Sequence, residues 1–291
     1  MKTLGTLIFA FAASQGLAWA QGRVEERRPA ASDGIVKIEN AAGSIKVVGW
    51  EREEIEVTGT LGRGAEGLSI DGRGRQTRIE VKTLGNPHAV HSDLEIRVPA
   101  GSRLDMESFN ARISVSAVKG PVKAESVNGS ISVTGGAQEA DLSTVNGGID
   151  VSCPCTRVRA ESVNGPVTIQ GSSGEVEAST VNGALVVEGG TFERGQLETV
   201  NGSIRFQGDL HAKAALDLES VSGSVELVLP AKVSADFSVS TFSGDIVNEL
   251  GPAARRSSRF TTEKELTFST GSGGAKVTVS TLSGEIHLRK R

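Results

Sequence analysis

The sequence predicts an all-β protein that folds as a repetitive β-solenoid, a parallel β-helix-like stack of coils of about 18 residues each. Three observations predict this class. A short motif, Ser or Thr followed by Val, Asn and Gly, recurs at a nearly constant interval. Apolar and polar residues alternate on both sides of the motif, and no long window has the apolar period of a helix. Gly is abundant, at 36 of 291 residues, which is typical of a chain that turns often.

The motif occurs five times in full, and its glycines lie 18, 18, 18 and 19 positions apart. Its Asn-Gly pairs, which we expect to form a structural turn ladder, are Asn128 and Gly129, Asn146 and Gly147, Asn164 and Gly165, Asn182 and Gly183, and Asn201 and Gly202. Three later copies have Ser in place of Asn, at Ser222, Ser243 and Ser283, and the 40-residue interval before the last indicates a degenerate repeat or an insertion. An incomplete copy at Asn110 and an outlying one at Asn40 precede the series.

Each coil supplies apolar residues at positions −6, −4 and −1 before the Asn and at +3 and +5 after it. Alternation on either side of the turn is the period of half-buried strands. We therefore predict one continuous core that includes Val122, Ala124, Ile131, Val133, Val158, Ala160, Val167, Ile169, Val176, Ala178, Leu185 and Val187. The outward position −3 reads Glu125, Ser143, Glu161, Ser179, Glu198 and Glu219. Stacked coils would place these residues side by side, with Ser separating the first carboxylates. We also expect the Ser or Thr at −2 to form a hydroxyl ladder.

An antiparallel β-meander is the alternative architecture, in which each Asn-Gly forms a type I′ hairpin turn. Pro166 favours the solenoid, because it directly follows Asn164 and Gly165. The residue at that position closes a two-residue hairpin with its backbone N–H, which Pro does not have. The regular spacing also favours stacked coils, since a change in coil length would break a ladder.

The N-terminus has the features of an export signal. Lys2 precedes an apolar run, and Ala18-Trp19-Ala20 is a small-x-small cleavage site. We predict a signal peptide at residues 1–20, a flexible segment at 21–32 and one β-solenoid domain at 33–291, with irregular loops near 61–76, 84–92 and 251–264. The exported chain is then expected in the periplasm or at the cell surface.

Charge and composition exclude several partners. A net charge of −4 provides no field for nucleic acid or anionic lipid, and we expect no membrane-spanning segment. The one local basic cluster, Arg255 to Arg259, is interpreted as a solvated insertion. The expected partner is an unidentified envelope or extracellular ligand, either a glycan or a protein.

Few residues are candidates for chemistry. Cys153 and Cys155 are expected to form a disulfide that closes a small ring in an oxidising compartment, or to remain free thiols. A metal site there would need two further ligands that the neighbouring sequence does not offer. His88 and His91 are interpreted as exposed loop histidines. We therefore expect no catalytic residues, no cofactor and no metal.

Several stretches together resemble the bacterial family of unknown function called putative adhesin, a relative of the auto-transporter adhesin head domain GIN. They are Val36 to Asn40 with Gly43 to Trp50, Leu94 to Gly101, the Asn-Gly series, and Ser280 to Ile286. The resemblance covers roughly residues 33–290 and implies a secreted or surface β-solenoid without assigned catalytic residues.

These observations predict an exported, non-enzymatic module for adhesion or interaction with the cell envelope. The alternative is a polysaccharide-active enzyme on a β-helix scaffold, because fold alone does not exclude catalysis. A sugar-cutting site usually combines paired carboxylates with aromatic platforms. The sequence has no Tyr and, beyond the signal, a single Trp at position 50.

Overall fold

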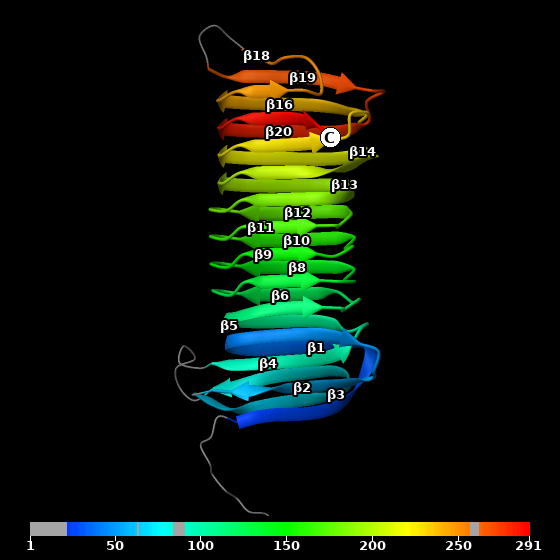
Figure 1. Cartoon of the computed structure of the whole chain (residues 1–291), viewed down its shortest axis with the longest axis vertical. Coiled ribbons are helices and arrows are strands. Elements are labelled where there is room, and N and C mark those ends of the chain that lie inside the picture. Colours follow the sequence, from blue (N-terminus) through cyan, green and yellow to red (C-terminus); the bar gives the residue numbers. More distant parts are fainter. Residues whose placement is uncertain (1–21, 63, 84–90, 257–261) are drawn as a thin grey trace, which may run out of the picture.

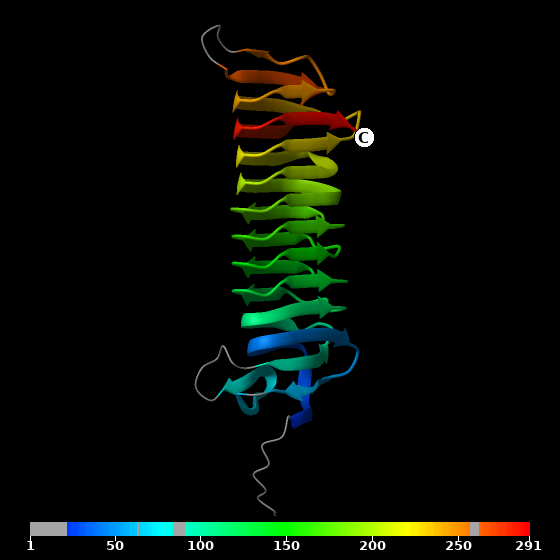
Figure 2. The ribbon, with the colours of Figure 1, turned by 60° about the vertical axis from the view of Figure 1, so that its left-hand side comes forward.

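The computed structural model describes residues 22–62, 64–83, 91–256 and 262–291. These residues form one continuous sheet of 21 strands that winds into an elongated stack (Figures 1 and 2). The chain is therefore all-β, as predicted. None of the described residues belongs to a helix that is long and apolar enough to cross a membrane.

The strands of the N-terminal and middle parts are β1 (Gly22–Trp50), β2 (Glu54–Leu61), β3 (Ala65–Thr83), β4 (Ser92–Pro99), β5 (Arg103–Ser116), β6 (Val122–Ser126), β7 (Ile131–Thr134), β8 (Glu139–Thr144), β9 (Ile149–Ser152), β10 (Arg157–Ser162), β11 (Val167–Gln170) and β12 (Gly174–Thr180). Those of the C-terminal part are β13 (Leu185–Asn201), β14 (Ile204–Ser222), β15 (Val225–Leu229), β16 (Ala235–Ser243), β17 (Ile246–Asn248), β18 (Arg255–Arg256), β19 (Lys264–Thr270), β20 (Ala275–Ser283) and β21 (Ile286–Lys290).

Strands of the repeat region pair in parallel with the strands one repeat away. Val122 lies opposite Ala140, which in turn lies opposite Val158. On the other side of the corner, Ile131 lies opposite Ile149. Parallel pairing excludes the antiparallel meander here, because a hairpin joins antiparallel strands. The result is a β-solenoid-like repeat.

Pro166 fits this arrangement for a backbone reason. In the stack the residue two after the Asn contributes its carbonyl, and the N–H of Ile149 donates to the carbonyl of Pro166 at 2.9 Å. The equivalent carbonyl in the next coil belongs to Ala184, which accepts from Val167. Because an acceptor is what these bonds require at this position, Pro can occupy it.

The core follows the predicted alternation. All twelve side chains named from the sequence are at most 2% exposed and belong to one apolar cluster that runs the length of the stack. Larger rings fill the C-terminal half, where Phe192 and Phe206 have centroids 5.2 Å apart and Phe237 stacks on Phe268 at 4.6 Å. The inward positions −6, −4, +3 and +5 therefore determine the buried face.

Chain order and stack order differ at the N-terminal end. Strand β1 pairs with β5 on one side and with β3 and β4 on the other. Strands β3 and β4 follow β1 in the sequence, yet they lie farther from the repeat region than β1 does. Asn40 lies opposite Ser108 in this register, and Ala42 lies opposite Asn110. The outlying copy thus places Asn40 at the position of the motif's Ser, buried and bonded to Ser92.

A similar crossing occurs at the C-terminal end. Strands β20 and β21 pair with β14 and β15 on one side and with β16 and β17 on the other. In Figure 1 the red C-terminal strands accordingly lie between yellow and orange ones. Strand β19 then pairs antiparallel with β16 and with the short β18. The 40-residue interval before the last motif therefore contains β18 and β19, which form this end of the stack.

Three segment predictions need correction, and two others lie wholly or largely outside the described residues. Residues 22–29, within the segment expected to be flexible, form an antiparallel ladder with β2. Residues 65–76, expected to be a loop, belong to β3, and residues 255 and 256 form β18. Strand β2 pairs with residues 22–29, β1 pairs with Gly74 and Gln76 of β3, and β19 pairs with β18, so these partners satisfy backbone groups that were expected to be solvated. The predicted signal peptide and positions 84–90 and 257–261 lie outside the described residues.

Candidate functional site

The Asn side chains of the repeat form a hydrogen-bonded ladder along one corner of the stack. Each amide nitrogen donates to the amide oxygen of the preceding Asn, at distances from 2.6 to 3.0 Å. The ladder joins Asn110, Asn128, Asn146, Asn164, Asn182 and Asn201. Its amides bond to one another, so this row is a structural feature of the corner.

The Ser and Thr hydroxyls at −2 do not form the expected ladder with one another. Thr144 donates to the carbonyl of Gly129 in the preceding coil at 3.0 Å and accepts the N–H of its own Gly147 at 3.2 Å. Ser162 repeats both bonds with Gly147 and Gly165. These hydroxyls are buried, and they tie each turn to the coil beneath it.

The motif glycines are required by the close approach of adjacent coils. A Cβ added at any of the five Gly positions would lie 1.8 to 2.2 Å from a backbone oxygen of the neighbouring coil. None of the five has a positive φ, whereas a type I′ turn requires positive φ at both central residues. Gly is therefore present because stacking leaves no room for a side chain.

The apolar residue at −1 points outward. These residues form an apolar stripe that crosses nine coils, with exposed fractions near 40% for most of them and 55% for Leu282. In stack order the stripe is Phe109, Val127, Val145, Val163, Val181, Val200, Val221, Leu282 and Phe242. Position −1 shares the apolar character of the inward positions, and its exposure was not predicted from the sequence. The alternation of side chains along a strand could have predicted the exposure: if positions −6 and −4 point inward, then −2 also points inward and −1 points outward.

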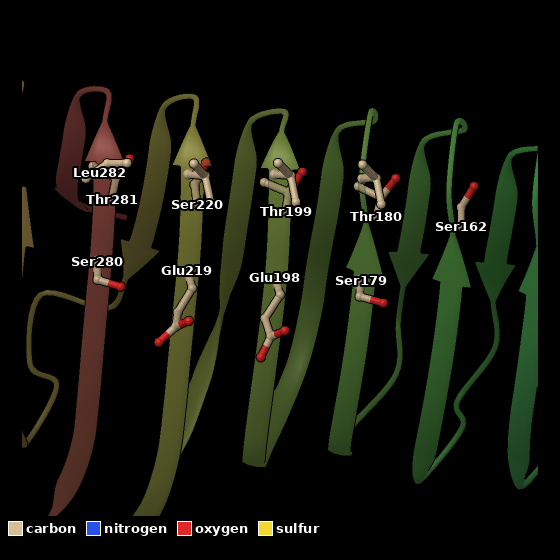
Figure 3. A pocket seen from close by; sticks show the side chains of 13 residues that line it. Ser162, Ser179, Thr180, Glu198, Thr199, Glu219, Ser220, Ser280, Thr281 and Leu282 are labelled. Atoms are coloured by element: carbon tan, nitrogen blue, oxygen red, sulfur yellow. The ribbon is translucent and has the colours of Figure 1, made fainter.

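Over the C-terminal half of the stripe the surface is hollowed into a groove of about 550 Å³. Its floor is the stripe from Val181 to Leu282, and Glu198 and Glu219 rise beside it from neighbouring strands (Figure 3). The remaining lining is Ser162, Ser179, Thr180, Thr199, Ser220, Ser280 and Thr281. A smaller hollow of about 310 Å³ includes Phe109 at the opposite end of the stripe. An exposed, hollowed apolar surface of this length is typical of an interaction site.

Charges beside the stripe are balanced in the earlier coils. At −5 and −3 of the same coil, Lys123 contacts Glu125 at 2.7 Å and Arg159 contacts Glu161 at 2.6 Å. Lys37 bridges to Glu107 of the adjacent coil at 2.8 Å. Each of these carboxylates therefore faces a cation.

The groove lacks such cations. Glu198 and Glu219 lie opposite each other in the strand register, and Asp217 lies opposite Gln196, which donates to Glu198 at 2.7 Å. Among the described residues no ion pair joins these three carboxylates to a cation. Burial raises the pKa of Asp217 and of Glu219, and the neighbouring carboxylates raise both further. The groove is therefore a locally acidic, uncompensated part of the face.

We expect this acidic cluster to make stability depend on pH. A carboxyl whose pKa is raised by folding stabilises the protein while protonated, and that contribution is lost as the pH rises through the raised pKa. Asp217 faces Gln196 and Glu198 on β13 and Thr278 and Ser280 on β20, and Lys276 lies one outward position away, opposite Ala215. Asp217→Asn should therefore raise the melting temperature at pH 7 by a few degrees.

The advantage of Asp217→Asn should disappear below the ordinary aspartate pKa of 3.8, which thermal unfolding across pH can measure. Asp141→Asn is the matched control, because Asp141 occupies the same row between Lys123 and Arg159. That variant should gain no stability at pH 7. An equal gain in both variants would contradict the assignment to the groove.

Cys153 and Cys155 are joined by a disulfide, with Cα atoms 5.2 Å apart. Both side chains are buried in the core cluster. Their spacing lies within the usual range of about 4.4–6.8 Å, so the turn at Pro154 brings the thiols within reach. The pair is thus part of the packing and is not presented to solvent.

Removing the disulfide is expected to change stability little, because so small a loop restricts the unfolded chain only slightly. Cys153→Ala with Cys155→Ala should destabilise the protein toward the low end of the range of about 0–5 kcal/mol. Thermal unfolding of this variant, compared with the parent under reducing and oxidising conditions, measures the effect. Loss of the folded state in the double variant would show that the pair does more than close a turn.

The other sequence candidates do not converge on the groove. His91 is exposed and contacts Asp93 at 3.4 Å, and His88 lies outside the described residues. Within the described ranges no three His, Cys, Asp or Glu side chains are arranged to hold a metal ion. The groove is therefore the candidate functional site.

Comparison with known proteins gives one family and a few distant structures. No curated protein matches the chain at a significant level. A putative adhesin from Parabacteroides distasonis is 9% identical with a TM-score of 0.34, covering 93% of this chain and 97% of its own. A putative adhesin from Parabacteroides merdae is 8% identical with a TM-score of 0.30, covering 92% and 96%. A putative cell adhesion protein from Clostridium sporogenes is 8% identical with a TM-score of 0.22, covering 93% and 100%.

Likeness at this level says nothing about function. The sequence model of the Toastrack family, DUF4097, matches residues 36–289, which span the stack apart from its outermost residues. The chain belongs to the Toastrack DUF4097 family.

Proposed function

We propose that this protein is an exported, non-enzymatic β-solenoid with coils of about 18 residues, and that it acts as an adhesion or cell-envelope interaction module through its groove. The observation that carries the proposal is the apolar stripe. Exposed apolar side chains at the same position of nine successive coils cost solvation free energy along the whole stack. A partner that covers the part of the stripe within the groove, from Val181 to Leu282, recovers the free energy of that part.

Export is supported by two features. Residues 1–20 have the sequence pattern of a cleaved signal, and the buried Cys153–Cys155 disulfide suits an oxidising compartment. Cell fractionation with N-terminal sequencing tests this part. A periplasmic or surface form that begins after Ala20 would support it, and a cytoplasmic chain that retains residue 1 would contradict it.

The interaction role is tested by binding of the purified chain, from residue 21 onward, to isolated bacterial envelope fragments. Val181→Ser with Val200→Ser should abolish binding, because both residues lie on the floor of the groove. Val127→Ser with Val145→Ser changes the same stripe outside the groove and is the matched control. Binding that survives the groove variant would overturn the proposal.

A polysaccharide-active enzyme is the second candidate, and one observation favours it. Glu198 and Glu219 are adjacent in the groove and the pKa of Glu219 is raised, which is a pattern found in acid–base pairs. Against it, no aromatic ring belongs to the described lining, whereas sugar sites usually offer one. A glycan-depolymerisation screen decides, because turnover that is lost in Glu198→Gln or Glu219→Gln would replace the proposed function with this one.

A further inference from the structure

We propose that the groove binds a cationic amphipathic helix, so that apolar side chains on one face of the helix cover the stripe and its Lys or Arg residues meet Glu198 and Glu219. This inference rests on the proposed function and names the chemistry of the partner at the same site. It follows from two independent properties of the groove, the spacing of its apolar floor and the sign of its charge.

The spacing of the floor matches a helix. Val200, Val221 and Leu282 come from consecutive strands of the sheet, and Val181 directly follows the next strand, β12; adjacent strands are about 4.8 Å apart. Three intervals therefore span about 14 Å, compared with about 16 Å for three turns of an α-helix. Three same-face intervals of an extended peptide span about 20 Å. A helix that lies along the stack can thus place one apolar residue per turn on each coil, whereas a strand loses register after the first contact.

The charge of the groove determines the sign of the partner. In the earlier coils Glu107, Glu125 and Glu161 each pair with a Lys or Arg, whereas no ion pair joins Glu198, Glu219 or Asp217 to a cation among the described residues. One Asp217 carboxylate oxygen is also buried without a hydrogen-bond donor. The other side of the stripe is neutral, with Asn201, Ser222 and Ser283 at the corner. Cations of the partner are therefore expected on one side of its apolar face only.

A second copy of this chain suits the groove less well. Two copies that face each other groove to groove bring Glu198 and Glu219 of one chain near Glu198 and Glu219 of the other, and among the described residues no ion pair supplies a cation to these residues in either copy. Like charges that face each other across an interface oppose association. A cationic helix has no such penalty.

The test uses three synthetic peptides of about 14 residues, a length of about 21 Å as a helix. The first places Leu at i, i+3, i+4 and i+7 with Lys elsewhere. The second has the same length with Leu and Lys in strict alternation, and the third replaces Lys with Glu in the helical pattern. Fluorescence anisotropy should show binding of the first peptide that weakens with salt, with at least about tenfold weaker binding of the other two.

Protein variants place the contact. Glu198→Gln with Glu219→Gln should weaken the Leu/Lys helix about tenfold. Glu125→Gln with Glu161→Gln removes two carboxylates of the same row that already have cations, and it should leave binding unchanged. Equal effects of the two variants, or equal binding of all three peptides, would overturn the inference.

Two further outcomes separate this inference from the proposed function. In the first outcome, Val181→Ser with Val200→Ser abolishes envelope binding, but the parent protein binds the Leu/Glu helix as tightly as the Leu/Lys helix. This outcome would overturn the cationic partner and leave the interaction role intact. Self-association in sedimentation experiments that the same valine variant abolishes would assign the stripe to a second copy and would also overturn the inference.

Discussion

Gly147→Ala is expected to destabilise the protein by about 3 kcal/mol, at the upper end of typical overpacking costs. The new Cβ would lie 2.1 Å from the carbonyl oxygen and 2.6 Å from the carbonyl carbon of Gly129 in the adjacent coil. Both are backbone atoms held by the parallel ladder, so no side chain can rotate away. Two coils must separate locally, which weakens hydrogen bonds on both sides of the corner. Urea unfolding followed by circular dichroism measures the loss.

The next residue is a matched control for Gly147. Gly148 has no positive φ, and a Cβ there would meet its nearest atom, the Pro166 oxygen, at 3.4 Å. Gly148→Ala should therefore be neutral or stabilise by up to about 1 kcal/mol, since it reduces the freedom of the unfolded chain. Equal destabilisation by the two substitutions would mean that backbone flexibility, and not stacking distance, requires the motif glycine.

Ile131→Ala is expected to cost about 2–5 kcal/mol. Ile131 is fully buried between Ile113 and Ile149, its partners on the two adjacent strands. Truncation leaves a cavity that the surrounding coils cannot fill, because the hydrogen bonds of the ladder hold them at a constant spacing. Thermal and urea unfolding of the purified variant give the free energy of unfolding.

Two further variants calibrate the cavity at Ile131. Ile131→Val removes one methylene and should cost about 0.5–1.5 kcal/mol. Ser132→Ala changes the adjacent outward residue and should stay within about 0.5 kcal/mol of the parent. A cost for Ile131→Ala as small as that of Ser132→Ala would show that this layer of the core does not support the stack.

Local pattern was sufficient to predict the inside of the repeat. Side chains alternate with a period of two in any strand, so Val122, Ala124, Ile131 and Val133 could be assigned to the core before any partner strand was known. Constant spacing also predicted lateral neighbours, because equal coils bring equal positions together. Glu125 lies beside Ser143 for that reason, and Glu198 beside Glu219.

The role of the motif itself was only partly evident from its residues. Asn-Gly is a strong hairpin signal, and Pro166 opposed that interpretation at one position only. The hydroxyls at −2 were expected to bond to one another, yet each bonds to a glycine carbonyl of the preceding coil. The distance between adjacent corners determines which acceptor each hydroxyl reaches. That distance is a property of two stacked coils, so the sequence of one coil does not reveal it.

By itself the sequence determined the all-β class, the buried face, the repeat and the neighbours within it, because these depend on alternation and on coil length. Only the tertiary structure decided the order of coils at the two ends, because strands with the same apolar pattern can pair with either of two neighbours. The groove depends on that order. Leu282 extends the floor next to Val221 only because β20 lies between β14 and β16, so residues distant in the chain complete the site.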